Sequence, residues 1–161
     1  MEQIKKRVQD SYTTQVQILT QANLNGYNRL FGGQMMSWMD IVAAVVARRH
    51  SGCNVTTARV DGLVFRAPAY ANDTLTLTGR LCYVGRTSME IRVRVYVEAL
   101  NGQRQMINEA YFIMVALDEN DKPVVVPSLI LQTEDEHLAW AHGEERQRIR
   151  KQRKKDKLDG I

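Results

Sequence analysis

The sequence predicts an α+β fold in which one curved antiparallel sheet wraps around a single long central helix. The first observation is an almost uninterrupted apolar stretch: from Met35 to Ala47 every residue except Ser37 and Asp40 is apolar or small. Such a stretch is too short to cross a bilayer and too evenly apolar for a surface helix. The second observation is the period-two alternation of apolar and polar residues over 74–117, which is typical of strands.

The apolar stretch contains one carboxylate, Asp40. Because burying an unpaired polar group costs on the order of 2 to 7 kcal/mol, an Asp at this place needs a partner or a function. Two interpretations are open: a functional acid inside the helix, or the N-cap of a shorter helix that follows a strand over 31–39. Gly32-Gly33 is a poor strand centre, and no Glu or Gln follows Asp40 by three residues to complete a capping box. We therefore favour the functional interpretation.

The first third of the chain predicts a strand, a loop and this helix. Residues 1–10 form a polar lead, residues 11–19 alternate as a first strand, and residues 20–29 form an Asn-rich loop. The helix continues to Arg48 and ends near Gly52, the residue type favoured just after a helix.

Two strands follow the helix. Residues 55–65 form one that is closed by Pro68, which cannot donate to a sheet ladder. The next strand has Leu residues on one face, and Gly79 interrupts them as a bulge or as a point of close approach.

The last strands are joined by the strongest turn signal in the chain. Asn101-Gly102 predicts a tight hairpin between residues 89–100 and residues 103–117. Residues 123–127 then form a short apolar exit strand.

A charged segment follows the predicted domain, which we place at residues 1–130. Between Arg146 and Lys157 lie eight basic residues and one acid, and without them the chain carries 14 basic and 17 acidic residues, a net charge of −3. The basic excess therefore belongs to this run near the C-terminus, and residues 131–161 predict an outer basic helix that frays into a tail. It has no aromatic residues among its basic run, so we expect no nucleic-acid partner.

The composition also argues against several classes of protein. The chain begins with charged and polar residues instead of a secretory apolar region, and no apolar run reaches the roughly 18 residues of a membrane helix. We expect a cytoplasmic protein without a membrane partner. The two cysteines, Cys53 and Cys82, form no CxxC pair and predict neither a disulfide scaffold nor a metal site.

Five short pieces occur in an order that a known family shares. They are NGYNRLFGG at 25–33, Met-Asp at 39–40, VFRAP at 64–68, VGRTS at 84–88 and VVP at 125–127. With these pieces, from about Val16 to Leu129, the chain resembles the hotdog-fold acyl-coenzyme A thioesterases, the acyl-CoA hydrolase family with its YciA-like and brain-type members. One helix wrapped by one antiparallel sheet is the hotdog arrangement.

The resemblance implies hydrolysis of an acyl-CoA thioester to a free carboxylic acid and coenzyme A. In this family the site lies at a dimer interface. Asp40 takes the position of the catalytic acid, as general base or as nucleophile. Gly32 and Gly33 take that of the turn whose backbone N–H groups, at a helix N-terminus, hold the thioester oxygen.

A second polar group near the carbonyl is also implied. Asn28 is the best candidate for it, but the loop is about one residue longer than usual, so Asn25 and Asn23 remain alternatives. Phe31 is a candidate for substrate binding, and it occupies a position where many relatives have His.

For the coenzyme half, the resemblance places the nucleotide near Arg86, Thr87 and Ser88, which without the resemblance would be an ordinary polar hairpin turn. Arg66 is a weaker candidate for substrate binding. Coenzyme A belongs to substrate and product, so no separate cofactor and no metal are implied.

The resemblance further implies a homo-oligomer built from dimers, either left as dimers or assembled into tetramers or hexamers. Two other functions remain open. A hotdog dehydratase usually carries a His on the helix, and here the only nearby one is His50 at the helix end. A hotdog protein can also bind acyl-CoA without cleaving it.

Overall fold

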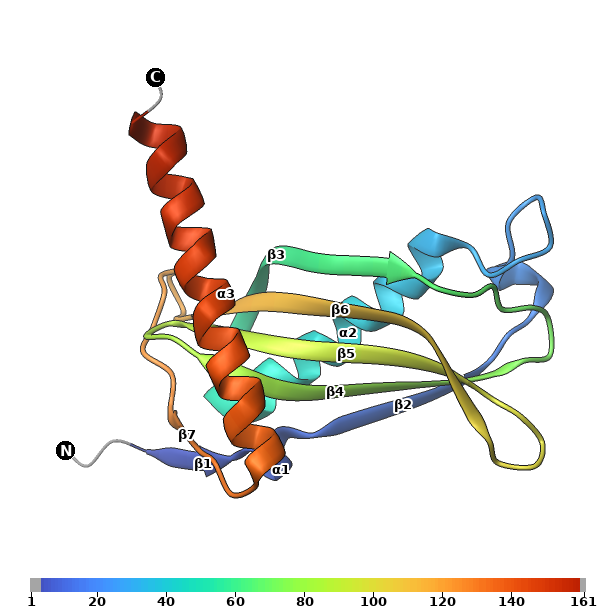
Figure 1. Cartoon of the computed structure of the whole chain (residues 1–161), viewed down its shortest axis with the longest axis horizontal. Helices are drawn as coiled ribbons and strands as arrows, with labels where there is room; N and C mark the ends of the chain where they lie inside the picture. The colour runs from blue at the N-terminus through green and yellow to red at the C-terminus, as the bar shows by residue number, and fades with distance from the viewer. Residues whose placement is uncertain (1–3, 160–161) are drawn as a thin grey trace.

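The computed structural model describes residues 4–159 and shows one five-stranded antiparallel sheet curved around one long helix (Figure 1). The strand order is β2-β4-β5-β6-β3, so β2 and β3 are the edge strands. This arrangement confirms the predicted fold class. The elements in chain order are β1 (Lys5–Arg7), α1 (Val8–Ser11), β2 (Thr13–Ile18), the 3-10 helix η1 (Gln21–Asn23), α2 (Gly32–Ser51), β3 (Asn54–Phe65), β4 (Thr74–Val84), β5 (Ser88–Glu98), β6 (Arg104–Leu117), β7 (Ser128–Ile130) and α3 (Glu134–Asp159).

Helix α2 packs one face against the sheet and leaves the other face open. The face toward the sheet consists of Met35, Met39, Val42, Ala43, Val46, Ala47 and His50, all buried. On the opposite side Ile41 is 51% exposed, so in a single chain this apolar side of the helix is left uncovered. The reason is that one sheet covers only one side of a helix. The helix ends at Gly52, which adopts the predicted left-handed conformation with φ +70°.

The sheet approaches α2 closely at Gly79. A Cβ at this position would lie 2.7 Å from Cγ1 of Val42, which explains the glycine in an apolar strand face. The register is continuous there, so the alternative prediction of a bulge at Gly79 is wrong; the irregularity lies between Leu81 and Tyr83. The predicted hairpin is confirmed, with Gly102 at φ +85° in the turn between β5 and β6.

The start of the described chain pairs with the segment that precedes α3, which the sequence did not predict. Strand β1, within the predicted polar lead, runs parallel to β7. The predicted exit strand at 123–127 is wrong: this segment is held by single backbone bonds, from Val124 N to the Ala116 carbonyl and from Val126 N to the Arg86 carbonyl, and the strand forms after it. Three-residue strands give too little alternation to be recognised.

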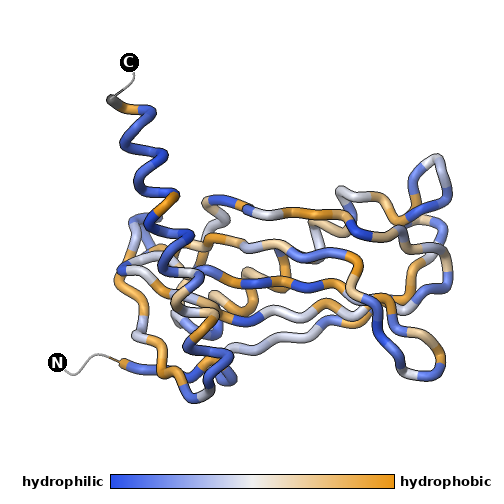
Figure 2. The backbone as a smooth tube through the Cα atoms, viewed as in Figure 1, coloured by the Kyte–Doolittle hydropathy of each residue, from blue (hydrophilic) through white to orange (hydrophobic). Residues whose placement is uncertain are grey.

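Helix α3 crosses the outer face of the sheet, opposite α2 (Figure 1). Trp140 packs on Tyr83 with ring centroids 4.5 Å apart. Glu90, almost fully buried, accepts hydrogen bonds from Arg146 at 2.6 Å and Arg150 at 3.2 Å, so two of the basic residues serve the fold. The helix continues to Asp159, and its strongly hydrophilic last turns project beyond the sheet (Figure 2). Among residues 4–159 no helix is both long and apolar enough to cross a bilayer.

Candidate functional site

Asp40 projects from the third turn of α2 toward the edge strand β3. The hydroxyl of Thr57 donates to Oδ1 of Asp40 at 2.7 Å, and the same hydroxyl lies 3.4 Å from Sδ of Met114. Asp40 lies well inside a helix that begins at Gly32, so the N-cap interpretation is wrong. Its side chain is only partly buried in the single chain. The pair therefore places a carboxylate at the open edge of the sheet, within reach of water.

The start of α2 is an uncapped helix N-terminus. Phe31 is the N-cap residue, and its side chain makes no capping bond. The first helical bond to this end runs from Met35 N to the Phe31 carbonyl at 3.1 Å, so the N–H groups of Gly32 and Gly33 have no acceptor within the helix. These N–H groups and the helix dipole together suit an oxyanion.

Both glycines lie against aromatic rings. A Cβ at Gly33 would lie 2.6 Å from the Phe31 ring, and a Cβ at Gly32 would lie 3.3 Å from the Phe65 ring. Larger residues would force the rings to move and would cover the helix end. The backbone donors are thus kept accessible.

The three candidate asparagines occupy different places in the loop before α2. Oδ1 of Asn25 accepts from Tyr27 N at 2.9 Å and Arg29 N at 3.3 Å, which fixes the amide group and leaves its NH₂ free to donate. Asn23 uses its Oδ1 to accept from Thr20. Asn28 is exposed at the loop tip, with φ +56°.

Asn25 also lines a cavity beside the start of α2. The cavity has a volume of about 320 Å³, and Met35, Phe65 and Arg66 lie in its wall. Arg66 is half-exposed and lies 4.0 Å from Glu109, at the limit of an ion pair. The cavity brings together the predicted residue Arg66 and the alternative Asn25, while Asn28 lies away from it.

The predicted nucleotide turn connects β4 and β5. Gly85 N donates to the Ser88 carbonyl at 2.9 Å, while the Arg86 and Thr87 carbonyls accept from Val126 and Ala116. The backbone of the turn is thereby fixed, and the Arg86 side chain is exposed.

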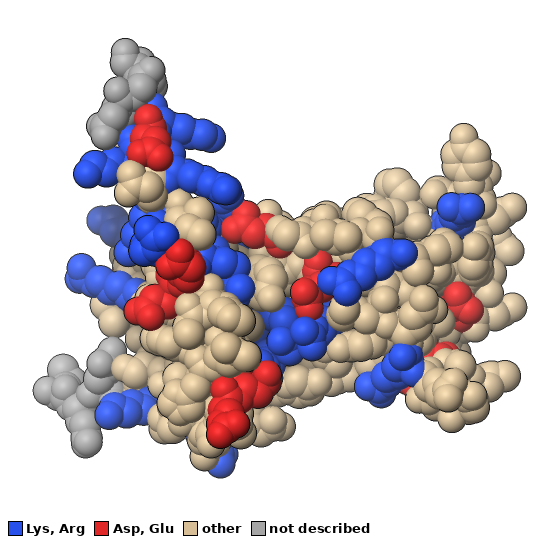
Figure 3. Space-filling view, viewed as in Figure 1, with Lys and Arg blue, Asp and Glu red and all other residues tan. Residues whose placement is uncertain are grey.

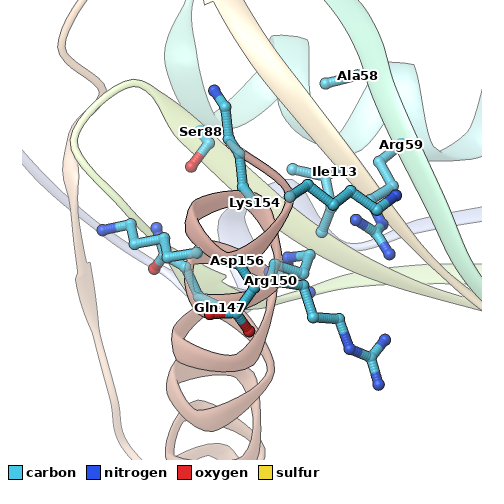
Figure 4. Close-up of a pocket in the computed structure, with 11 residues that line it drawn as sticks. Ala58, Arg59, Ser88, Ile113, Gln147, Arg150, Lys154 and Asp156 are labelled. Carbon is cyan, nitrogen blue, oxygen red and sulfur yellow. The ribbon is translucent and has the colours of Figure 1, made fainter. Parts of the chain in front are cut away.

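Ser88 lies beside a hollow of about 750 Å³ between β3 and the C-terminal half of α3. Figure 4 shows Arg150 and Lys154 on the helix side of it and Arg59 on the strand side. Its full lining is Ala58, Arg59, Ser88, Ile113, Gln147, Arg150, Lys151, Arg153, Lys154, Asp156 and Lys157. The hollow is strongly basic.

The helix start and the carboxylate are separated along α2. Gly33 and Asp40 are seven residues apart, which corresponds to about 10 Å of helix axis. A catalytic group that acts on a carbonyl has to approach it to about 3 to 3.5 Å. In one chain, the two groups are therefore poorly placed to act on the same carbonyl.

An apolar surface lies along the open side of α2 and the edge strand β3. Phe31 and Phe65 are each 55% exposed, and Ile41 and Val64 are about half exposed. Exposed apolar side chains next to an unpaired strand edge are typical of a protein interface.

His50 lies far from this site. It is buried in the last turn of α2, where Nε2 makes a 2.8 Å hydrogen bond with the Pro127 carbonyl. Burial lowers the pKa of His50 below its ordinary value. In the described part of the chain no three His, Cys, Asp or Glu residues are placed to hold a metal ion.

Thr57 is the site residue that the sequence reasoning missed. It is one of several Thr residues in strand patterns, and only the packing of β3 on α2 singles it out.

Comparison with known proteins shows which family this chain resembles. Residues 27–101 match the model of the thioesterase superfamily. An uncharacterized acyl-CoA thioester hydrolase of Bacillus subtilis, YkhA, is 37% identical over 132 residues, which cover 81% of this chain and 77% of that protein. A solved apo-hexameric acyl-CoA thioesterase superposes with a TM-score of 0.89 at 35% identity and covers 93% of this chain and 97% of its own.

A Staphylococcus aureus acyl-CoA hydrolase, solved with butyryl coenzyme A and coenzyme A, superposes with a TM-score of 0.89 at 27% identity, covering 98% of this chain and 96% of its own. Its solved variants include replacements of one Asn, one Asp and one Thr by Ala, the Asn fifteen residues before the Asp and the Thr seventeen after it. Asn25, Asp40 and Thr57 have the same residue types at the same spacing.

Proposed function

The chain belongs to the thioesterase superfamily, among the acyl-CoA thioester hydrolases. We therefore propose that it hydrolyses acyl-coenzyme A thioesters to a free carboxylic acid and coenzyme A. The observation that carries the proposal is the Asp40–Thr57 pair at the open edge of the sheet. A positioned carboxylate that water can reach can act as the general base in thioester hydrolysis.

Asp40 acts on the carbonyl carbon of the thioester. As general base it takes a proton from a water molecule, whose oxygen forms the new C–O bond while the C–S bond breaks and the coenzyme leaves as a thiol after protonation. As nucleophile it forms an anhydride that water then cleaves. In both routes Thr57 holds one carboxylate oxygen and leaves Oδ2 free to react.

The negative charge that develops on the thioester oxygen needs donors. We assign the N–H groups of Gly32 and Gly33 and the amide NH₂ of Asn25 to this role, in preference to Asn28. Loss of one such donor typically costs about 3 kcal/mol of transition-state stabilisation. Because Gly33 and Asp40 are separated along one helix, we propose that a site combines Asp40 of one chain with the helix start of a second chain.

A shared site requires a homo-oligomer built from dimers. Two copies related by a two-fold axis can cover the apolar surface around Phe31, Ile41 and Phe65 and pair their β3 edges. The hexameric state of a related enzyme supports further assembly of such dimers.

We assign the acyl chain and the nucleotide of the substrate to different parts of the surface. Apolar side chains at the helix start, Phe31 among them, suit an acyl chain, and Arg66 lies in the wall of the neighbouring cavity. Arg86, Thr87 and Ser88 suit the nucleotide, supported by the basic hollow next to Ser88. The chemistry uses no cofactor and no metal, since coenzyme A enters and leaves with the substrate.

We place the reaction in the cytoplasm. The two cysteines, Cys53 and Cys82, are free thiols in the structure, as is usual in a reducing compartment.

A panel of short, medium, long and aromatic acyl-CoAs with detection of free thiol tests the function. Wild type should release coenzyme A from at least one class, and Asp40→Asn should lose a factor of at least about 100 in turnover while keeping its fold. Binding of acyl-CoA without any thiol release would instead make this an acyl-CoA-binding protein. A dehydratase is disfavoured because His50, buried at the end of α2, lies about 15 Å along the helix from Asp40.

A further inference from the structure

The outer face of the sheet, on the side opposite α2, carries a cluster of three arginines: Arg80 on β4 and Arg92 and Arg94 on β5. Arg80 and Arg92 are direct cross-strand neighbours, and Arg94 lies two residues further along the same face of β5. Figure 3 shows basic side chains gathered in the middle of this face, beside α3. Like charges directly opposite each other destabilise a sheet, so this cluster needs an explanation.

Hydrogen bonds among the described residues leave some donors of this cluster without an acceptor. Arg80 is only 15% exposed at its side chain, and its Nη1 donates to Asp135 at 2.6 Å. Its Nε and Nη2 are buried and have no partner among residues 4–159. Buried polar groups without partners are rare and costly.

The neighbouring arginines differ in their pairing. Arg94 donates to Glu109 at 2.5 Å. The guanidinium of Arg92 has no hydrogen bond or ion pair with another residue in the described range. Burial, followed by the nearby charges of Arg80 and Arg94, lowers the pKa of Arg92 below its ordinary value. Arg92 is therefore a cation held at some cost next to two others.

A hollow of about 360 Å³ lies over Arg80 and Arg92. Its lining combines guanidinium and hydroxyl groups and contains no carboxylate: Tyr12, Thr78, Arg80, Arg92, Tyr96 and Arg104. Arg104 comes from β6 and makes only a long contact, 3.5 Å, with Glu98. The hollow thus presents donors from three guanidinium groups and three hydroxyls.

We propose that this hollow is a binding site for a phosphate group. Planar guanidinium forks match phosphate oxygens bidentately, and hydroxyl groups can complete the coordination. A phosphate dianion would provide acceptors for the unpaired guanidinium of Arg92 and would offset the repulsion between Arg80 and Arg92. Its excess of donors over acceptors suits a dianion better than a single carboxylate. This site follows from the cluster alone and does not depend on the activity proposed above.

The test uses the full-length protein in phosphate-free buffer at constant ionic strength, with inorganic phosphate, pyrophosphate and ADP as probes. Calorimetric titration should show saturable binding of at least one probe, and the melting temperature should rise by about 5 °C or more at a concentration about 100 times Kd. Arg92→Met should weaken binding at least tenfold. Arg48→Met, which removes an exposed arginine from the last turn of α2, is the matched control and should bind like wild type.

The probe-free proteins give a second readout. If Arg92 is kept for a ligand, Arg92→Met should melt at the same temperature as wild type or higher, because it removes a like charge. A purely structural arginine would give the opposite result, a lower melting temperature without any change in probe binding. That result, or the absence of saturable binding of all three probes to wild type, overturns the site.

Two further measurements identify the occupant. If Arg92→Met raises KM for acyl-CoA but not for the matching pantetheine thioester, the bound phosphate is one of the substrate's own. If KM is unchanged while probe binding is lost, a free phosphate compound is the ligand. Dissociation of the oligomer by Arg92→Met in probe-free buffer, together with unchanged probe binding, would show that a carboxylate of a second copy fills the hollow and would contradict the proposal.

Discussion

Thr57 and Asp40 form a 2.7 Å hydrogen bond that joins the edge strand β3 to the helix α2. A hydroxyl has one hydrogen to donate, so this bond occupies Oδ1 of the carboxylate and leaves Oδ2 for water or substrate. Met114 Sδ, 3.4 Å from the same hydroxyl, limits the ways in which Thr57 can turn. Thr57 is thus suited to hold the reacting group in one orientation.

Replacing Thr57 tests this positioning role. Thr57→Val keeps the shape but removes the donor, so we expect kcat to fall roughly tenfold to a hundredfold with little change in KM. Thr57→Ser restores the donor and should recover most of the activity. Steady-state kinetics over a pH series on both variants gives the answer; full activity in the Val variant, or equal losses in both, would remove Thr57 from the site.

We expect Asn25, but not Asn28, to be needed for turnover. Asn25→Asp keeps the oxygen that accepts from Tyr27 and Arg29 but loses the NH₂ donor, so kcat should fall by about 100-fold or more while the loop is retained. Asn28→Ala, at the exposed loop tip, should turn over within about twofold of wild type. Reversal of these two results would restore Asn28 as the residue near the carbonyl.

The sequence was informative where a property repeats along the chain. The apolar run of α2, the alternation in β4 to β6 and the turn at Gly102 each leave a local pattern, and the shared motifs located Asp40. Contacts that depend on the register between distant segments leave none. Thr57 meets Asp40 only because β3 packs beside α2, and Arg80 meets Arg92 only through strand pairing.

The conformation of the loop before α2 could not be predicted from the sequence either. The loop before α2 offered three asparagines, and only the backbone bonds that fix Asn25 distinguish it from its neighbours. Pairing of β1 with β7 joins segments more than 120 residues apart, and each is too short to show a period.

Arg86 should affect binding more than chemistry. If its exposed side chain pairs with a phosphate of the nucleotide, Arg86→Ala should raise KM for acyl-CoA with a smaller effect on kcat. The defect should shrink with a thioester truncated to pantetheine, which lacks the nucleotide. Equal losses on both substrates would place Arg86 elsewhere.

His50 should make stability depend on pH. Burial lowers its pKa in the folded protein, so between that value and the ordinary value of about 6.5 the unfolded chain binds more protons than the folded chain. Stability should therefore be complete above pH 6.5 and should decline as the pH falls below it.

A non-titrating residue isolates this effect. His50→Gln can still donate to the Pro127 carbonyl but does not take up a proton, so its free energy of unfolding should fall less than that of wild type between pH 7 and pH 5.5. Urea unfolding at fixed protein concentration measures both slopes, and the carboxylates contribute equally to each. Identical slopes would mean that His50 does not titrate in this range.

The shared site predicts that two inactive proteins can restore each other. Asp40→Asn removes the reacting acid. Gly33→Val places a branched side chain where even a Cβ would lie 2.6 Å from the Phe31 ring, and it should cover the N–H donors. If each site takes Asp40 from one chain and the helix start from the other, a dimer of the two variants contains one intact site and one doubly damaged site.

Co-refolding equal amounts of the two variants should therefore yield about a quarter of wild-type activity, because about half of the dimers are mixed and each has one working site out of two. Differently tagged chains allow the mixed dimers to be purified and counted, and each variant refolded alone is the control. Should Gly33→Val fail to fold, Gly33→Ala can replace it, since a single methyl group still meets the Phe31 ring. In a site built from one chain, both chains of a mixed dimer carry a damaged site, so purified mixed dimers without activity would place Asp40 and Gly33 in the same site of one chain.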